Sequence, residues 1–192
     1  HHKVDYLGVA FADEGISLIN AGISLPIMVL NPETTSFSSI IQYKLEPEIY
    51  SLKGLNAFLK IAQQRKLKQY PIHIKLDTGM HRLGFEAQDI EELIELLKQN
   101  PTIKVASIFS HLVGADESEH NMFTKTQVVL FEQKKKKIIA SLDGQKPLRH
   151  ICNSAGIIRF PEAKFDMVRL GIGLYGVEVT GTEQKELQTV GT

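Results

Sequence analysis

The chain alternates short apolar or β-branched runs with longer stretches in which apolar residues recur every three to four positions. The short runs predict strands at residues 6–10, 26–30, 40–45, 72–77, 105–111, 149–152 and 167–170. The longer stretches predict helices, among them residues 52–67, 89–99 and 118–141. Strand and helix signals that alternate in this way are typical of a parallel α/β fold.

Seven strand signals without a linker rich in proline, glycine or serine favour one domain over residues 1–192. The leading candidate is a TIM-type (β/α)8 barrel. Such barrels typically need about 250 residues, whereas this chain has 192. The sequence therefore predicts an incomplete barrel of about seven β/α units.

Composition excludes several classes of protein and site. The 22 basic and 22 acidic side chains give zero net charge, so nothing favours nucleic acid or an anionic membrane as a partner. The lysine run 134–137 lies in a predicted helix, which would spread it around the circumference, so a solvated face is expected. A single cysteine, Cys152, excludes a disulfide framework and a cysteine-rich zinc site. We expect no metal and a reducing compartment, the cytoplasm.

The predicted strand 72–77 alternates apolar and ionisable residues. Its apolar residues suit a helix layer, whereas His73, Lys75 and Asp77 would face the barrel interior. Burying three ionisable groups is costly unless they are paired or functional. Arg82 follows in a loop at the carboxyl end of the strand, where barrel enzymes carry their active sites. This segment alone fits an active site and a purely structural salt-bridge layer equally well.

The same segment contains Asp77–Gly79, an Asp-Thr-Gly tripeptide of the kind that carries the catalytic carboxylate in aspartic proteases. That chemistry needs two carboxylates that share a proton. The chain has no second tripeptide of this kind, and its helix content is unlike those mostly β proteins. A protease is therefore a poor interpretation, even with a second copy supplied by a homodimer.

Polar residues also follow the later predicted strands. His111 ends one strand, where a lone histidine is more often structural than catalytic. Asn153 and Ser154 lie at a strand-to-helix turn. Loops after the last two strands of such barrels frequently bind phosphate through backbone amides and a hydroxyl, and Ser154 with the amides of Gly171 and Ile172 fits that description. The glycines are equally compatible with a simple turn.

Four motifs together closely resemble the N-terminal barrel domain of alanine racemases, the pyridoxal 5'-phosphate (PLP) enzymes that interconvert L- and D-alanine. In chain order the motifs are residues 6–15 (YLGVAFADEG), 75–84 (KLDTGMHRLG), 110–117 (SHLVGADE) and 153–155 (NSA) followed by 168–176 (VRLGIGLYG). The resemblance covers essentially the whole chain, and it implies a PLP-binding TIM-type barrel.

The resemblance implies a role for each of four charged residues. Arg169 would hydrogen-bond the pyridine nitrogen of the cofactor, and His111 would orient Arg169. Because an arginine does not readily give the ring a proton, the ring would be a weak electron sink, which favours return of the proton to the α-carbon. Arg82 would contact the cofactor's phenolic oxygen and the substrate carboxylate. Lys75, which family members often carry as a carbamate, would position Arg82.

The resemblance also implies a phosphate site and exposes two absences. Ser154, Gly171 and Ile172 would hold the phosphate, and Asn153 would line the same pocket. The family's Schiff-base lysine motif, Lys-x-Asn-Ala-Tyr-Gly-His-Gly, has no match, since residues 53–58 echo only its first part within a predicted helix. The family's C-terminal β domain, which supplies a tyrosine as second base, is also unmatched. Two-base racemisation needs both groups, so we expect an inactive fragment with strands two to eight.

The parent protein implied by the resemblance supplies D-alanine for peptidoglycan. Its substrate would be alanine, its full-length form a homodimer, and neither nucleic acid nor a membrane is expected as a partner. Two alternatives stay open, a PLP-dependent racemase of another amino acid and a non-catalytic PLP-binding barrel. Retention of Arg82, His111 and Arg169 together argues against the non-catalytic barrel, because a scaffold has no evident use for them.

Overall fold

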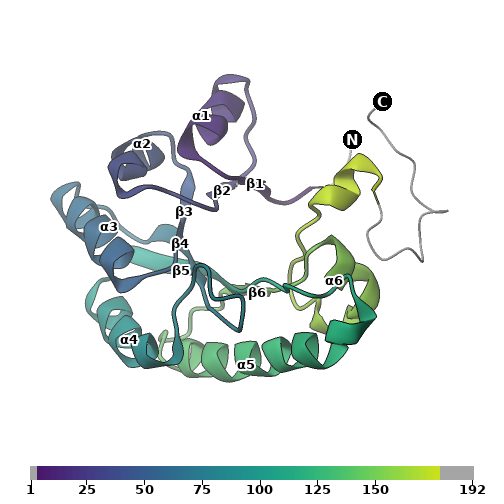
Figure 1. Cartoon of the computed structure of the whole chain (residues 1–192). Helices are drawn as coiled ribbons and strands as arrows, with labels where there is room; N and C mark the ends of the chain where they lie inside the picture. Colours follow the sequence, from purple (N-terminus) through teal and green to yellow (C-terminus); the bar gives the residue numbers. More distant parts are fainter. Residues whose placement is uncertain (1–3, 178–192) are drawn as a thin grey trace.

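The computed structural model describes residues 4–177, which form a curled parallel sheet with helices along its outer side (Figure 1). The six strands of this part are β1 (Leu7–Val9), β2 (Ile27–Val29), β3 (Glu46–Ile49), β4 (Tyr70–Lys75), β5 (Ile103–Phe109) and β6 (Leu148–His150). Each strand pairs in parallel with the next one along the chain, so the order in the sheet is the order in the sequence. This is the topology of a partial α/β barrel.

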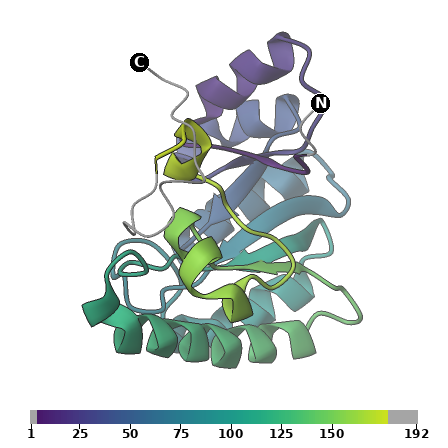
Figure 2. The ribbon, with the colours of Figure 1, turned by 90° about the vertical axis from the view of Figure 1, so that its right-hand side faces the viewer.

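Helices connect successive strands and cover the convex side of the sheet, as two perpendicular views show (Figures 1 and 2). They are α1 (Ala12–Asn20), α2 (Phe37–Gln42), α3 (Leu52–Gln64), α4 (Ile90–Gln99), α5 (Asn121–Ala140) and α6 (Ser154–Arg159). The predicted helices 52–67, 89–99 and 118–141 are confirmed as α3, α4 and α5. No helix within residues 4–177 is long and apolar enough to cross a membrane.

Helix α3 shows how the sequence builds one unit. Its first turn begins at Ser51, whose hydroxyl accepts a hydrogen bond from the Gly54 amide at 3.1 Å. Such a cap satisfies one of the free amides at a helix start and typically contributes about 1 kcal/mol. Leu55, Phe58 and Leu59 recur at helical spacing and are buried. The cap therefore fixes where the helix begins, and the apolar stripe fixes which face meets the sheet.

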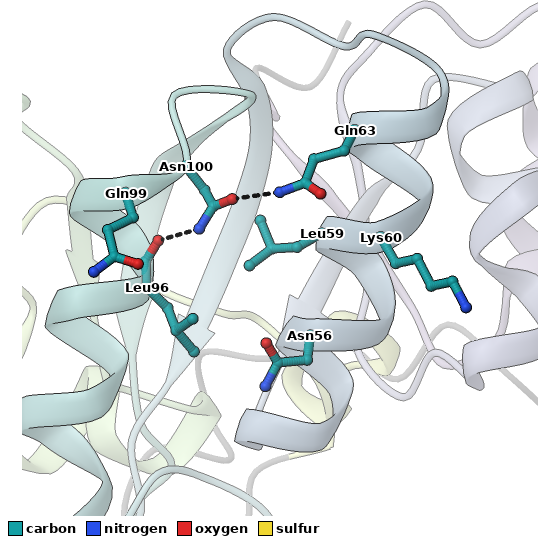
Figure 3. A pocket seen from close by; sticks show the side chains of 7 residues that line it. All are labelled: Asn56, Leu59, Lys60, Gln63, Leu96, Gln99 and Asn100. Atoms are coloured by element: carbon teal, nitrogen blue, oxygen red, sulfur yellow. Dashed lines mark hydrogen bonds between the residues drawn. The ribbon is translucent and has the colours of Figure 1, made fainter.

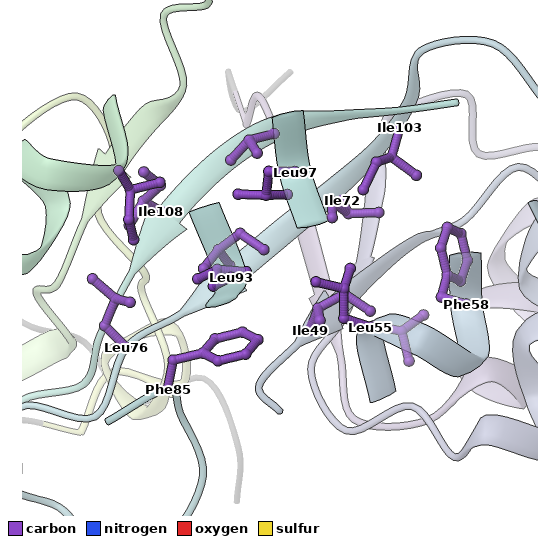
Figure 4. Packing of buried hydrophobic residues seen from close by; sticks show 14 of the residues in the cluster. Ile49, Leu55, Phe58, Ile72, Leu76, Phe85, Leu93, Leu97, Ile103 and Ile108 are labelled. Atoms are coloured by element: carbon purple, nitrogen blue, oxygen red, sulfur yellow. The ribbon is translucent and has the colours of Figure 1, made fainter. Parts of the chain in front are cut away.

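The core lies between the sheet and these helices (Figure 4). Side chains from the outer face of the strands meet side chains from α3 and α4, and those labelled in the figure are Ile49, Leu55, Phe58, Ile72, Leu76, Phe85, Leu93, Leu97, Ile103 and Ile108. Burying one such side chain contributes about 1.5–3 kcal/mol. The apolar face of the predicted strand 72–77 thus faces the helices, which leaves its ionisable face for the interior of the curl.

The predicted strand 40–45 is wrong. Phe37, Ile40 and Ile41 have the i, i+3, i+4 spacing of a helix, and all three are buried in α2. The true strand, β3, begins at Glu46 and contains Pro47, which pairs with the neighbouring strand β2. A proline between two glutamates is typical of a loop, and this explains why the sequence pattern did not reveal the strand.

The predicted strand 167–170 is also wrong, because it forms no strand ladder. It follows the sheet edge through two backbone hydrogen bonds, from the Met167 amide to the Arg149 carbonyl at 3.3 Å and from the Arg169 amide to the Cys152 carbonyl at 3.0 Å. The described residues therefore contain six strands where the pattern predicted seven. Cys152 is buried, as expected of a packed residue.

The lysine run 134–137 is not the fully solvated face that we expected. Lys135 is only 5% exposed, and its ammonium group lies 2.8 Å from a Glu132 carboxylate oxygen and 4.7 Å from the centre of the Phe165 ring. The helix turns this lysine towards the protein, where its aliphatic stem packs and its charge finds a partner. Lys136 and Lys137 are exposed as predicted.

Candidate functional site

The polar residues predicted as a site gather at the carboxyl ends of β4, β5 and β6. Lys75 is the last residue of β4, His111 follows β5 by two residues, and Asn153 follows β6 by three. Because parallel strands end at the same edge of a sheet, residues far apart in the sequence meet there. Arg169 joins them through its backbone hydrogen bond beside β6.

Arg169 lies at the centre of this group. Its Nη1 is 2.6 Å from His150 Nδ1, and its Nη2 donates to the carbonyls of Ser110 at 2.7 Å and Ile151 at 3.3 Å. The guanidinium carbon lies 5.2 Å from the centre of the Phe109 ring. Burial lowers the pKa of Arg169 to about 10, so the side chain remains a cation at neutral pH. Because these acceptors hold the guanidinium on several sides, they fix the direction in which its remaining N–H groups point.

The structure brings His111 near Arg169, as predicted, but His150 is the closer partner. His111 Nδ1 is 3.4 Å from Arg169 Nη2, which is long for a hydrogen bond. Burial, then the charges of Arg169, Lys75 and Arg82, lower the pKa of His111 to about 4, so its imidazole is neutral at neutral pH. The sequence pattern did not predict a site role for His150, although this residue lies in the predicted strand 149–152. That short run shows no alternation of polar and apolar residues.

The lowered pKa of His111 predicts a pH-dependent contribution to stability. Unfolded chains bind a proton on this histidine near pH 6.5, and the folded chain near pH 4. Its contribution is therefore complete above pH 6.5 and is lost as the pH falls towards 4, by roughly 3 kcal/mol. We expect His111→Gln to lose less unfolding free energy than the wild type between pH 7 and pH 4, as measured by urea denaturation.

A matched control for this measurement is His120→Gln, which removes an exposed histidine. Its pH dependence should follow the wild type. Parallel stability curves for the wild type and His111→Gln would show that His111 titrates alike in the folded and unfolded chain, and would contradict the expectation.

Lys75 is paired with a residue that the sequence pattern missed. Its Nζ lies 3.0 Å from Glu48 Oε1, and both side chains are at most 9% exposed. Burial raises the pKa of Glu48 to about 7, against the opposing charges of Lys75, Arg169 and Arg82. Glu48 Oε2 has no hydrogen-bond partner among the described residues. The expected contact between Lys75 and Arg82 is not seen, since the ammonium group of Lys75 meets a carboxylate instead.

Arg82 lies on a loop that returns to its own starting point. At the base of this loop the Asp77 amide donates to the Phe85 carbonyl at 3.0 Å. Asp77 Oδ1 accepts hydrogen bonds from the amides of Gly79 at 2.8 Å and His81 at 3.2 Å. This carboxylate therefore orders a turn, which fits no protease mechanism. Arg82 is exposed and makes no hydrogen bond or ion pair within residues 4–177, so its guanidinium is available to a ligand.

Helix α5 holds the two loops that carry Arg82 and His111. Lys134 Nζ donates to the carbonyls of Asp77 and Phe85 at the base of the first loop. Gln127 Nε2 donates to the carbonyl of His111 at 2.9 Å in the second. Lys134, like Lys135, therefore departs from the expectation that the lysine run 134–137 is a solvated face. Lys134 and Gln127 were missed because their partners are backbone carbonyls distant in sequence, which no local pattern reveals.

Asn153 orders the turn into α6. Its Oδ1 accepts a hydrogen bond from the Gly156 amide at 2.9 Å, and its Nδ2 donates to the Leu112 carbonyl at 3.0 Å. The predicted strand-to-helix turn at this asparagine is confirmed. Asn153 therefore joins the loop after β6 to the loop after β5.

Ser154 and the glycine segment converge as predicted. Ser154 Oγ accepts hydrogen bonds from the amides of Gly171 at 3.0 Å and Gly173 at 3.2 Å. Gly173 was not predicted, and Ile172 lies between these two glycines at the start of a 3-10 turn, Ile172–Tyr175. Phosphate oxygens accept hydrogen bonds from hydroxyl and backbone amide groups. While it accepts from these two amides, the Ser154 hydroxyl keeps its own proton to donate, and together with the Arg169 cation it fits the phosphate and the ring nitrogen of PLP.

A shallow groove of about 400 Å³ lies apart from this site, between α3 and α4 (Figure 3). Gln63 Nε2 donates to Asn100 Oδ1 and Asn100 Nδ2 donates to the Leu96 carbonyl, each at 2.8 Å, so its polar groups satisfy one another. The groove lies towards the ends of these helices that lead into β4 and β5, opposite the carboxyl ends of the strands. It adds no residue to the site.

Three exposed side chains in the loop before α5 also form a separate group. Glu117, Glu119 and His120 bring possible ligand atoms within 4.8 Å of one another. His120 Nε2 is 3.2 Å from a Glu117 oxygen and 3.6 Å from a Glu119 oxygen. These side chains contact one another on the surface, and nothing ties them to the strand ends.

Comparison with known proteins agrees with the resemblance. Residues 1–179 match the family model of the alanine racemase N-terminal domain. Alanine racemase 1 of Oceanobacillus iheyensis is 38% identical over 190 residues, which are 95% of this chain and 48% of that protein. Alanine racemase 1 of Bacillus subtilis is 33% identical over 183 residues, 94% of this chain and 45% of that protein. The chain spans about half the length of the curated relatives it matches.

Solved structures agree with the fold. The alanine racemase from D-cycloserine-producing Streptomyces lavendulae superposes with a TM-score of 0.88 at 27% identity, over 97% of this chain and 50% of that one. That from Bartonella henselae, described with covalently bound pyridoxal phosphate, has a TM-score of 0.83 at 25% identity, over 97% and 53%. By its family model, its relatives and its fold, the chain belongs to the alanine racemase family.

Proposed function

We propose that the chain is the PLP-binding barrel part of an alanine racemase that supplies D-alanine for peptidoglycan in the cytoplasm. In this proposal the six strands and the segment 167–170 correspond to strands two to eight of a (β/α)8 barrel, and the parent protein is a homodimer. The observation that carries the proposal is the partly buried Arg169 cation, held by acceptors at the carboxyl ends of the strands.

When bound, PLP supplies an electron sink for the bond that breaks at the substrate α-carbon. Arg169 would face the ring nitrogen as a donor that keeps its own proton, since its pKa of about 10 is above neutral pH. The ring then stays a weaker sink than it would beside an acid. By keeping its proton, Arg169 would favour return of a proton to the substrate α-carbon, which is what a racemase needs.

The remaining site residues would bind and orient. Ser154 with the amides of Gly171 and Ile172 would hold the phosphate, while Asn153 orders the turn beneath it. Arg82 would contact the cofactor's phenolic oxygen and the substrate carboxylate.

Two further residues would set the charge around the cofactor. Lys75 would balance the charge of Glu48, and its position beside the site would let it orient Arg82 once ligands are bound. His111 would orient Arg169 as a neutral acceptor.

The chain itself should bind PLP without a covalent bond and should not turn over alanine. Its 192 residues contain no match to the family's Schiff-base lysine motif, and two-base racemisation needs such a lysine. PLP titrated into the chain should shift the cofactor absorbance, and dialysis should remove the cofactor even after borohydride treatment. Substantial turnover of L-alanine by the chain would contradict this part of the proposal.

A matched pair of arginine variants tests the site. Arg169→Gln removes the partly buried cation at the strand ends, whereas Arg65→Gln removes an exposed arginine at the end of α3. We expect the first to weaken PLP binding at least tenfold and the second to leave it unchanged. Equal binding by both variants would show that PLP does not use this site.

A further inference from the structure

A line of buried polar side chains crosses the interior of the curl from Arg169 to β3. Beyond the contact with Arg169, His150 Nε2 lies 2.9 Å from Ser107 Oγ. Ser107 Oγ lies 2.7 Å from His73 Nδ1, and His73 Nε2 lies 2.8 Å from Glu46 Oε2. Four hydrogen bonds in series therefore join a cation to a carboxylate.

The sheet holds this line at fixed spacing. Its members come from β6, β5, β4 and β3, which are neighbours in the sheet, and His73 pairs directly with Ser107 in the β4–β5 register. His73, Ser107 and His150 are fully buried, and the Glu46 side chain is 12% exposed. Buried polar groups must find partners within the protein, and here each finds them within the line.

When both histidines are neutral, the two ends dictate the direction of every hydrogen bond. Arginine can only donate, so His150 Nδ1 accepts and the ring carries its proton on Nε2. That proton goes to Ser107, whose own hydroxyl then donates to His73 Nδ1. The His73 proton is therefore on Nε2 and is donated to Glu46, and an ionised carboxylate can only accept. With both histidines neutral, one arrangement of protons satisfies all four bonds.

The reverse arrangement would fail at Arg169. With its proton on Nδ1, His150 would present an N–H group to the N–H groups of the guanidinium, so two donors would face each other. Tyr6 completes the other end, since its hydroxyl donates to the same Glu46 oxygen at 2.9 Å. Its ring stands edge-on to that of His73, with centres 5.7 Å apart. Among the neutral forms, both ends thus select the one protonated on Nε2 for each histidine.

We propose that Glu46 is a remote positioning residue for Arg169, acting through His73, Ser107 and His150. The anchored line keeps His150 Nδ1 aimed at the guanidinium, which fixes the donors that Arg169 offers to a ligand. This inference rests on the proposed function, because the ligand concerned is the ring nitrogen of PLP. It adds a determinant outside the strand ends, on a strand that the sequence pattern did not reveal.

Substitution of Ser107, the middle residue of the line, tests the positioning role. Ser107→Ala removes the shared hydroxyl, and Ser107→Thr restores one. Thr124→Val is the matched control, since Thr124 carries a fully buried hydroxyl with no hydrogen-bond partner among the described residues. With ¹⁵N-labelled histidine and no cofactor, the wild-type rings of His73 and His150 should show the neutral form protonated on Nε2. Ser107→Ala should move both sets of ring signals and weaken PLP binding about tenfold, whereas the other two should resemble the wild type.

Glu46 gives a second test that changes no residue near Arg169. Glu46→Leu removes the anchor and should shift the His150 ring signals from three hydrogen bonds away, whereas Glu46→Gln keeps an acceptor and should shift them less. Unmoved His150 signals in Ser107→Ala and Glu46→Leu, in a chain whose wild type binds PLP, would overturn the positioning role alone. A wild-type chain that binds no PLP would instead overturn the proposed function, even if the ring signals respond.

Discussion

Replacing Gly84 by alanine should destabilise the chain by roughly 3–5 kcal/mol and displace the loop that carries Arg82. Gly84 has a φ of +138°, a conformation that residues with a Cβ rarely adopt. A Cβ built there would lie 2.4 Å from the Asp77 amide nitrogen and 2.7 Å from the Leu76 carbonyl carbon. Both neighbours are backbone atoms at the end of β4, so they cannot move aside as a flexible side chain could.

The size of the effect follows from where the contact occurs. Phe85 donates its amide to the Lys75 carbonyl at 2.9 Å and accepts from the Asp77 amide, so the returning segment lies directly against the strand end. A methyl group at Gly84 would push the two segments apart and break both hydrogen bonds. Lys134 would then lose the paired geometry of the two carbonyls it binds. The substitution should therefore also weaken PLP binding through Arg82.

Gly22→Ala separates crowding from backbone strain. Gly22 also has a positive φ, +86°, but no atom lies within 4 Å of its Cβ position. Backbone strain alone should lower the free energy of unfolding of Gly22→Ala by about 1 kcal/mol. Urea denaturation of both variants measures the difference, and a Gly84→Ala variant no less stable than Gly22→Ala would show that the loop can shift at little cost.

The long elements of this fold could be predicted from the sequence because their signal is local. Helices α3, α4 and α5 each repeat apolar residues over several turns, so the pattern identifies them whatever they pack against. Strand β3 gave no such signal, because Pro47 interrupts it and glutamates occupy the interior-facing positions Glu46 and Glu48. Those glutamates are there to meet His73 and Lys75 on the neighbouring strand, a reason that only the folded sheet supplies.

The site divides in the same way. Arg82, His111 and Arg169 lie in motifs that resemble a known family, so the sequence alone singled them out. His150 and Gln127 act through partners that are distant in sequence, and no motif marks them. The cost of burying His73 and Lys75 could be predicted from strand alternation. The identity of the groups that offset this cost could not, because pairing across strands depends on register.

Replacing Lys75 by methionine should destabilise the chain by about 3 kcal/mol at pH 8, because it leaves the Glu48 carboxylate buried without a counter-charge. Glu48 is fully buried, one of its oxygens lies 3.0 Å from the Lys75 ammonium nitrogen, and the other has no partner among the described residues. Water cannot replace the lost ion pair at such a depth. The carboxyl group must therefore stay charged at high cost or take up a proton.

The pH dependence of this loss has a definite sign. Burial already raises the pKa of Glu48 to about 7, and Lys75 opposes that rise. Without the lysine the pKa rises further, so the folded variant binds a proton that the unfolded chain, with a pKa near 4.5, releases. Stability from a raised carboxyl pKa is present below the unfolded pKa and is lost as the pH rises through the folded one. The defect of Lys75→Met should thus be large at pH 8 and smaller at pH 5.5.

Two further variants show whether the buried pair is the cause. Lys137→Met removes a lysine of the same size from an exposed pair, where Nζ is 3.6 Å from a Glu91 oxygen, and it should have no measurable effect. Lys75→Met combined with Glu48→Gln removes both charges and should recover most of the loss at pH 8, since a neutral amide costs less to bury than a carboxylate. Urea denaturation at both pH values gives the coupling between the two residues. If Lys75→Met matched Lys137→Met, or if its defect were the same at both pH values, Glu48 would have to find another partner in the folded chain.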